Sequence, residues 1–147
     1  MDREFITHLM KRAGCQDPPH IRTLPGDDTW VLIPVKDIYN VIQSFLSEIP
    51  DWHLTAITGQ DTGECIELMY HFWFEEGVTF CIRLPYEDPT IRSITPLIPG
   101  AAFYEREVIE MLGVRDPELK EEKLLLLPDL WSKGWPLRID KTGEGNE

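Results

Sequence analysis

The spacing of apolar residues between 38 and 49 constrains the fold of this chain more than any other feature. These residues recur at intervals of three and four, which places them on one side of an α-helix: Ile38, Val41, Ile42, Phe45, Leu46 and Ile49. The pattern predicts an amphipathic helix of about three turns that ends at Pro50. A helix with one apolar face needs a second layer against which to bury it.

Three segments after this helix alternate apolar and polar residues, which is typical of β-strands with one buried face. They span 54–58, 65–74 and 78–84, and turn residues separate them at 60–63 and 75–77. Short turns predict an antiparallel meander whose apolar face is covered by helices. The sequence therefore predicts a two-layer α+β fold, with a mixed, mainly antiparallel sheet, helices packed on one face and an extended C-terminal tail.

Weaker patterns predict the other elements. They are a helix over 5–13 ended by Gly14, a loop over 20–28, a strand over 30–33, an edge strand over 91–95, and a helix over 101–112 ended by Gly113.

The C-terminal part from residue 124 is apolar but has no period. It holds four consecutive leucines and two tryptophans, Trp131 and Trp135, and its prolines block regular structure. Such a segment cannot form a core by itself, so we expect it to lie extended along another subunit, with both tryptophans as anchors. We accordingly divide the chain into an α+β domain over 1–113, a partner-binding tail over 114–140 and a disordered C-terminus over 141–147.

The chain has 147 residues and a formal net charge of −12. This acidity argues against nucleic acid as a partner, because phosphate binding needs clustered Lys and Arg, and against docking on anionic lipid. Solubility is the simpler explanation of the charge. No segment approaches the roughly 20 apolar residues that span a bilayer, so no direct membrane insertion is expected. Three widely spaced cysteines indicate no disulfide framework and favour a cytoplasmic setting.

The sequence shows no motif for a cofactor or a metal. Its glycines form no phosphate-binding loop, and no two cysteines have C-x-x-C spacing. A metal site built from distant His and Cys residues stays open as an alternative, as does a nucleophilic pair of Cys81 with His71. Cys81 lies inside a predicted strand, where a buried small side chain explains it as well.

The helix over 101–112 carries a charged face that has two explanations. Glu105, Arg106, Glu107 and Glu110 lie opposite an expected core-facing stripe of Tyr104, Val108, Met111 and Leu112. The charged face is either solvated, with Arg106 and Glu110 paired at i, i+4, or it is an interface that fixes how a partner docks.

Two motifs resemble the 30 kDa subunit family of respiratory complex I. That family includes the 30 kDa-type subunit of bacterial NADH:quinone oxidoreductase and the matching subunits of membrane-bound, energy-converting nickel–iron hydrogenases and formate hydrogenlyases. Its helix pattern, E-R-E-x-x-D-M-F-G, is matched by Glu105–Gly113, with Glu110 in place of the aspartate and Leu112 in place of the phenylalanine. Its second pattern, L-L-P-D-x-W-x-G-x-P-L-R-K-D, is matched by Leu126–Trp131 and Gly134–Asp140. The family's G-H-P-D-L-R-R connector is changed to Arg115–Glu121 here, which loses the Gly-His pair.

The resemblance implies a structural subunit without a redox cofactor or catalytic site of its own. It implies a place in the hydrophilic arm of a membrane-bound oxidoreductase, peripheral on the inner, cytoplasmic face of the membrane. The expected partners are the large catalytic subunit, of the 49 kDa or hydrogenase large-subunit type, and the iron–sulfur small subunit. Iron–sulfur clusters and the quinone or nickel–iron site are expected in those partners.

Under this resemblance the interfacial explanation of the charged face is favoured. The expected partner-binding residues come from the two motifs: Glu105, Arg106, Glu107, Glu110, Leu127, Pro128, Asp129, Trp131, Trp135, Pro136, Leu137 and Arg138. A small soluble enzyme or an acidic binding protein that acts alone is the competing interpretation.

Overall fold

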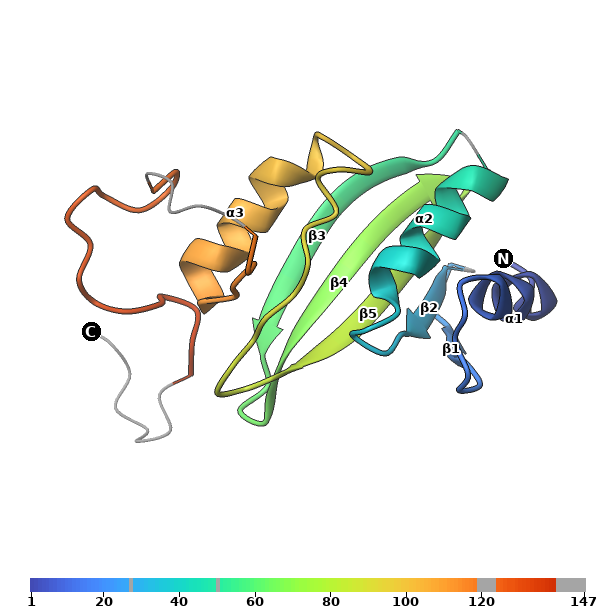
Figure 1. The fold of residues 1–147 in the computed structure, drawn as a ribbon, viewed down its shortest axis with the longest axis horizontal. Helices are drawn as coiled ribbons and strands as arrows, with labels where there is room; N and C mark the ends of the chain where they lie inside the picture. The colour runs from blue at the N-terminus through green and yellow to red at the C-terminus, as the bar shows by residue number, and fades with distance from the viewer. Residues whose placement is uncertain (27, 50, 119–123, 140–147) are drawn as a thin grey trace. The chain divides into compact units, whose positions relative to one another are not determined.

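The computed structural model describes residues 1–26, 28–49, 51–118 and 124–139. It contains one mixed five-stranded sheet and three helices, which confirms the predicted α+β class (Figure 1). In chain order the elements are α1 (Arg3–Arg12), β1 (His20–Thr23), β2 (Thr29–Leu32), α2 (Ile38–Glu48), β3 (His53–Asp61), β4 (Cys65–Phe74), β5 (Glu76–Pro85) and α3 (Ala101–Leu112).

The strands lie in the order β1-β2-β5-β4-β3. β1 pairs with β2 in antiparallel register, with Ile21 opposite Val31, and β2 pairs with β5 in parallel, with Val31 opposite Phe80. The sheet is mixed because β2 and β5 are parallel neighbours. The segment between them, which contains α2, β3 and β4, is long enough for the crossover that a parallel pair needs. The strand order leaves β1 and β3 as the edge strands.

The chain divides into two compact units, and strands β3, β4 and β5 contribute to both. One unit contains Met1–Ala56 and Met69–Ile82, and the other contains Ile57–Leu68 and Arg83–Glu147. The predicted division into a domain over 1–113 and a tail over 114–140 stays a prediction, and the predicted disorder over 141–147 lies outside the described residues.

In the first unit, α2 packs its apolar face on the sheet. The Phe45 ring lies 5.2 Å from the ring of Phe72 on β4 and 5.1 Å from that of Phe80 on β5. Phe45 is fully buried, as the helical spacing predicts. Burial of a side chain of this size contributes roughly 2 kcal/mol to folding, so this aromatic cluster holds the helix on the sheet.

In the second unit, α3 approaches β3 closely at Gly59. A Cβ atom at this position would lie 2.4 Å from Cδ1 of Leu112 and 3.3 Å from Cγ1 of Val108. Only glycine leaves room for the two helix side chains at this distance. The contact orients α3, and with it the charged residues of the helix.

The structure confirms most predicted elements and corrects four. α2, β4 and α3 lie at or within one residue of their predicted bounds, and Gly113 ends α3 with a left-handed φ of 69°. The loop predicted over 20–28 is wrong at its start, because His20–Thr23 pair with β2 as β1. The turns predicted at 60–63 and 75–77 are shorter than predicted, because β3 continues to Asp61 and β5 already begins at Glu76. The edge strand predicted over 91–95 is wrong, since these residues form a loop. Within the described part of the chain, no helix has both the length and the apolar character that crossing a membrane requires.

Candidate partner-binding surface

Helix α3 turns two of its four predicted interface charges inward. Glu105 is 9% exposed and Glu110 is 6% exposed. Glu107 is exposed, as expected of a charged face, and Arg106 is half-buried. A buried carboxylate is costly unless hydrogen bonds compensate for lost water, so the partners of these two residues decide their role.

Glu105 holds the loop that was predicted to be a strand. One carboxylate oxygen accepts the main-chain N–H of Ile94 at 2.7 Å. The other accepts the hydroxyls of Ser93 at 2.6 Å and Thr95 at 2.9 Å. The carboxylate thus supplies the acceptors that a neighbouring strand would otherwise provide, which is why residues 93–95 are ordered without joining the sheet.

Glu110 holds the tail at residues 125–127. Its carboxylate accepts main-chain N–H groups of three consecutive residues, Leu125, Leu126 at 2.8 Å and Leu127 at 3.0 Å. Burial raises the pKa of Glu110, but these three donors and the nearby Arg106 outweigh that effect and hold its pKa below the ordinary value. The ionised carboxylate is therefore the form that orders the chain here.

Asp61 and Tyr86 hold the end of the described tail. Oδ2 of Asp61 accepts the main-chain N–H of Ile139 at 2.7 Å and lies 2.9 Å from the Tyr86 hydroxyl. The Arg138 guanidinium donates to the Tyr86 carbonyl at 3.0 and 3.1 Å, and its carbon lies 4.4 Å from the centre of the Tyr86 ring. Burial raises the pKa of Asp61, but hydrogen bonds from Gly63, Ile139 and Tyr86 and the charge of Arg138 outweigh burial. The pKa of Asp61 therefore lies below its ordinary value.

A third contact fixes the tail where α3 ends. A Cβ atom at Gly113 would lie 2.4 Å from the Trp135 indole, so the ring lies against the glycine backbone. The main-chain N–H of Leu137 donates to the Met111 carbonyl at 2.9 Å. Trp135, Gly113, Tyr86 and Arg138 also line a pocket of about 610 Å³ beside these contacts.

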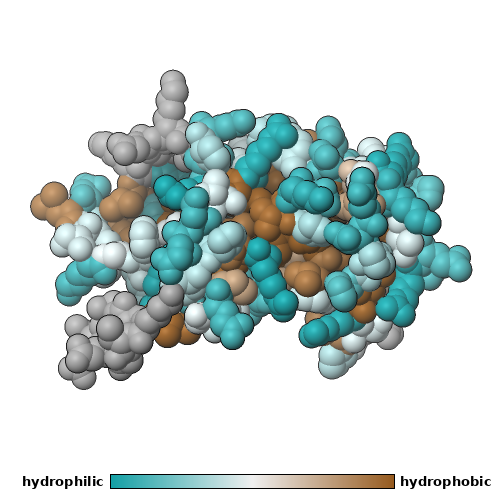
Figure 2. Space-filling model, turned by 60° about the horizontal axis from the view of Figure 1, so that its bottom comes forward, coloured by the Kyte–Doolittle hydropathy of each residue, from teal (hydrophilic) through white to brown (hydrophobic). Residues whose placement is uncertain are grey.

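Between these attachments the tail presents apolar side chains to solvent. Leu130 is 93% exposed, and the other exposed members are Leu124, Leu125, Leu126, Trp135, Leu137 and Ile139. The turn that carries Leu130 is closed by the Trp131 main-chain N–H, which donates to the Pro128 carbonyl at 2.9 Å. Figure 2 shows hydrophobic side chains, in brown, open to solvent between the hydrophilic ones on one face. An ordered segment with this much exposed apolar surface has the character of a binding surface.

No candidate metal centre is formed by the described His, Cys, Asp and Glu side chains, which nowhere gather in groups of three or more with suitable geometry. His71 hydrogen-bonds with the Thr79 hydroxyl at 2.9 Å, and burial lowers its pKa. Cys81 is buried, and its thiol contacts the Ile82 carbonyl.

Comparison with known families identifies the chain's relatives. The family model described as the 30 kDa subunit of respiratory-chain NADH dehydrogenase matches residues 31–147. The match begins within β2 and includes all later elements and the tail. The chain belongs to this 30 kDa subunit family.

Relatives within the 30 kDa family include subunits of two kinds of enzyme complex. A subunit of the F(420)H(2) dehydrogenase of Methanosarcina mazei is 30% identical over 142 residues, which cover 93% of this chain and 85% of that protein. The beta subunit of the membrane-bound hydrogenase of Pyrococcus furiosus is 29% identical over 126 residues, which cover 80% of this chain and 72% of that protein.

The 30 kDa family fold is also present in a solved structure. A chain of the membrane-bound sulfane sulfur reductase, an archaeal respiratory membrane complex, superposes with a TM-score of 0.74 at 18% identity, and the match covers 92% of this chain and 82% of that one. The likeness confirms the fold of the present chain.

The predicted interface residues differ in their contacts and exposure. Glu105, Glu110 and Arg138 contact this chain's own loops, whereas Glu107, Pro128, Asp129, Pro136 and Leu137 are exposed. Leu127 and Trp131 are half-buried. Sequence reasoning missed Asp61, Tyr86 and Leu130. The turn sequence Asp61-Thr62-Gly63 is a local signal for Asp61, but no local signal links Tyr86 to residues 52 and 53 positions away.

Proposed function

We propose that this chain is a non-redox structural subunit in the hydrophilic arm of a membrane-bound oxidoreductase of the complex I or energy-converting hydrogenase type. In this role it docks the large catalytic subunit and the iron–sulfur small subunit. Membership of the 30 kDa family supports the proposal, as do the names of the relatives, which are subunits of a dehydrogenase and of a membrane-bound hydrogenase.

One observation carries the docking role. The tail from 124 to 139 is fixed to α3 and Tyr86 by half-buried hydrogen bonds, yet it turns its apolar side chains outward. A segment ordered in this way loses little conformational entropy when a partner covers it, so its apolar area contributes efficiently to binding. We propose Leu130 as an additional anchor beside Trp131 and Trp135, because its side chain is almost wholly available to a partner.

We further propose that the iron–sulfur clusters and the quinone or nickel–iron site reside in the partner subunits, and that the complex places this chain at the cytoplasmic face of the membrane. Metal analysis of the purified chain tests the first statement. Stoichiometric iron or zinc, retained after chelation and lost in Cys81→Ser, would contradict it.

The docking role is tested by co-purification from the source cells with an affinity-tagged chain. Leu130→Asp should reduce recovery of the large subunit about thirtyfold, since loss of an interface anchor costs about 2 kcal/mol or more. Trp131→Ala should also reduce recovery of the large subunit. Leu24→Asp is the matched control, because Leu24 is an exposed leucine outside both the tail and α3.

Circular dichroism of each purified variant separates loss of docking from loss of folding. If a folded Leu130→Asp chain recovered as much large subunit as the wild type, the tail would not be part of the interface. Recovery of the wild-type chain as a monodisperse protein without co-purifying subunits would favour a protein that acts alone.

A further inference from the structure

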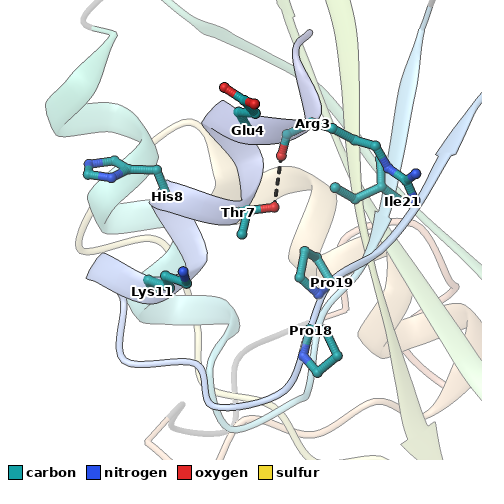
Figure 3. A pocket seen from close by; sticks show the side chains of 8 residues that line it. All are labelled: Arg3, Glu4, Thr7, His8, Lys11, Pro18, Pro19 and Ile21. Atoms are coloured by element: carbon teal, nitrogen blue, oxygen red, sulfur yellow. Dashed lines mark hydrogen bonds between the residues drawn. The ribbon is translucent and has the colours of Figure 1, made fainter.

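A groove with both cationic and apolar walls lies between α1 and β1. Side chains of α1, including Arg3 and Lys11, form one wall, and Pro18, Pro19 and Ile21 form the other, around a volume of about 460 Å³ (Figure 3). The family model begins at residue 31, so both walls lie outside its match. The groove is separate from the tail and from the role proposed for it.

The register of β1 shows which main-chain groups face away from the sheet. Leu24 donates its N–H to the Asp28 carbonyl at 2.8 Å, which makes this a hydrogen-bonded pair of the antiparallel ladder. Hydrogen-bonded pairs alternate along such a ladder, so Arg22 bonds to β2 whereas Ile21 and Thr23 turn their N–H and C=O groups outward. No described residue forms a hydrogen bond with these outward groups.

This free edge is short. Pro18 and Pro19 precede β1 and have no N–H to donate, which limits strand pairing to the segment from Ile21 onward. Ile21 belongs both to the free edge and to the apolar wall of the groove. A peptide bound at this edge would therefore place side chains into the groove.

The α1 wall carries two cations, Arg3 and Lys11, and one carboxylate, Glu4. Arg12 pairs with Glu48, and the Met1 amino group pairs with Glu76, but neither Arg3 nor Lys11 forms an ion pair with a described residue. Figure 3 shows Arg3 reaching across the groove toward Ile21, whereas Glu4 points away from the proline wall. In a chain of net charge −12 this is a local site for a negative group.

We propose that this groove binds an extended acidic segment of another polypeptide, which adds to β1 as a further strand. Main-chain groups of Ile21 and Thr23 would pair with the segment, its carboxylates would face Arg3 and Lys11, and its apolar side chains would contact Pro18, Pro19 and Ile21. This is the geometry by which exposed sheet edges recognise peptides.

The experiment titrates the full chain with a synthetic peptide of alternating Glu and Val and follows the main-chain amides by NMR. We expect the Ile21 and Thr23 amides to shift, and binding to weaken about tenfold in Arg3→Glu. Ile21→Pro removes an outward N–H without removing a bond to β2, so it should abolish binding while the spectrum of β2 stays unchanged. A peptide of alternating Lys and Val is the control for charge.

Three results would overturn the proposal. They are no shift at Ile21 and Thr23 with millimolar Glu–Val peptide, equal binding of the Lys–Val peptide, and full binding by a folded Ile21→Pro chain. Binding to phosphatidylglycerol vesicles that Arg3→Glu abolishes and Ile21→Pro leaves intact would also contradict it, because charge alone would then explain recognition. A folded chain is verified for each variant by the dispersion of its spectrum.

Discussion

Two buried carboxylates of α3 provide hydrogen-bond acceptors for segments that have no strand beside them. Glu105 serves residues 93–95 and Glu110 serves residues 125–127. The helical periodicity predicts a solvated face for both residues, because carboxylates are polar. It contains no information about the loops, at 93–95 and 125–127, that pack against the helix. The family motif thus predicted that these residues matter, but the sequence did not show which segments of the chain they contact.

Replacing Glu110 by glutamine should loosen the tail. The amide keeps one oxygen acceptor but directs its NH2 group toward main-chain N–H groups that need an acceptor. We expect a loss of about 2 kcal/mol in the free energy of unfolding, the magnitude typical of buried hydrogen bonds to charged groups. Urea denaturation measures it, and amide hydrogen exchange at Leu125–Leu127 should accelerate.

Glu107→Gln is the control, since Glu107 is exposed on the same helix and its replacement should change stability by less than about 0.5 kcal/mol. Equal effects of the two substitutions would mean that Glu110 does not order the tail. The pH dependence gives a second check. Because the folded-state pKa of Glu110 lies below its ordinary value of 4.5, its contribution is fully present above that pH and is lost as the pH falls through the lowered pKa. In Glu110→Gln, the free energy of unfolding should therefore depend less on pH in the acid range.

Among the helices and strands, those with a strong internal period could be predicted and those that depend on distant partners could not. α2, α3 and β4 have long, regular patterns and distinct ends at Pro50, Gly113 and Glu75, and their predicted bounds are confirmed within a residue. β1 has no such pattern, because Pro, Gly and Asp surround four residues that are extended only through pairing with β2. Conversely, 91–95 has the composition of a strand, yet its Ile94 N–H donates to Glu105 and its Ile91 N–H donates to the Arg115 carbonyl.

The end of α3 gives a prediction about an element boundary. Gly113→Ala should destabilise the chain by about 2 kcal/mol, because an L-residue at φ 69° is strained and its Cβ would displace the Trp135 ring. Gly100→Ala is the matched control at the other end of the helix, where φ is −65° and no atom lies within 4 Å of an added Cβ. Thermal unfolding compares the two variants. If both unfold at the wild-type temperature, position 113 does not require glycine.

At the scale of the whole molecule, an excess of acidic residues acts on every part of the fold at once. Lys and Arg number 14 against 26 Asp and Glu, and the described ion pairs join only a few of them. Like charges at this density repel one another and oppose compaction. The acidity, read from composition alone, thus bears on stability and solubility and does not specify the fold.

Salt should therefore stabilise the isolated chain. Raising NaCl from about 0.01 M to about 0.15 M shortens the Debye length from about 30 Å to about 8 Å, which screens the repulsion between carboxylates. We expect the urea midpoint to rise over this interval. Sucrose at equal osmolality serves as the uncharged control. A midpoint that falls with NaCl would show that attractive ion pairs outweigh the net charge.

The two attachments of the tail also bear on chain length. Glu110 fixes residues 125–127 and the α3 end fixes 137, so the turn around Leu130 is a closed loop. Doubling the length of such a loop raises the entropy of closure by only about 0.6 kcal/mol. Folding alone would thus tolerate insertions of several residues here with little loss, whereas each insertion would carry Leu130 farther from its anchors. The number of residues between the two attachments therefore sets how far Leu130 can extend toward a bound partner.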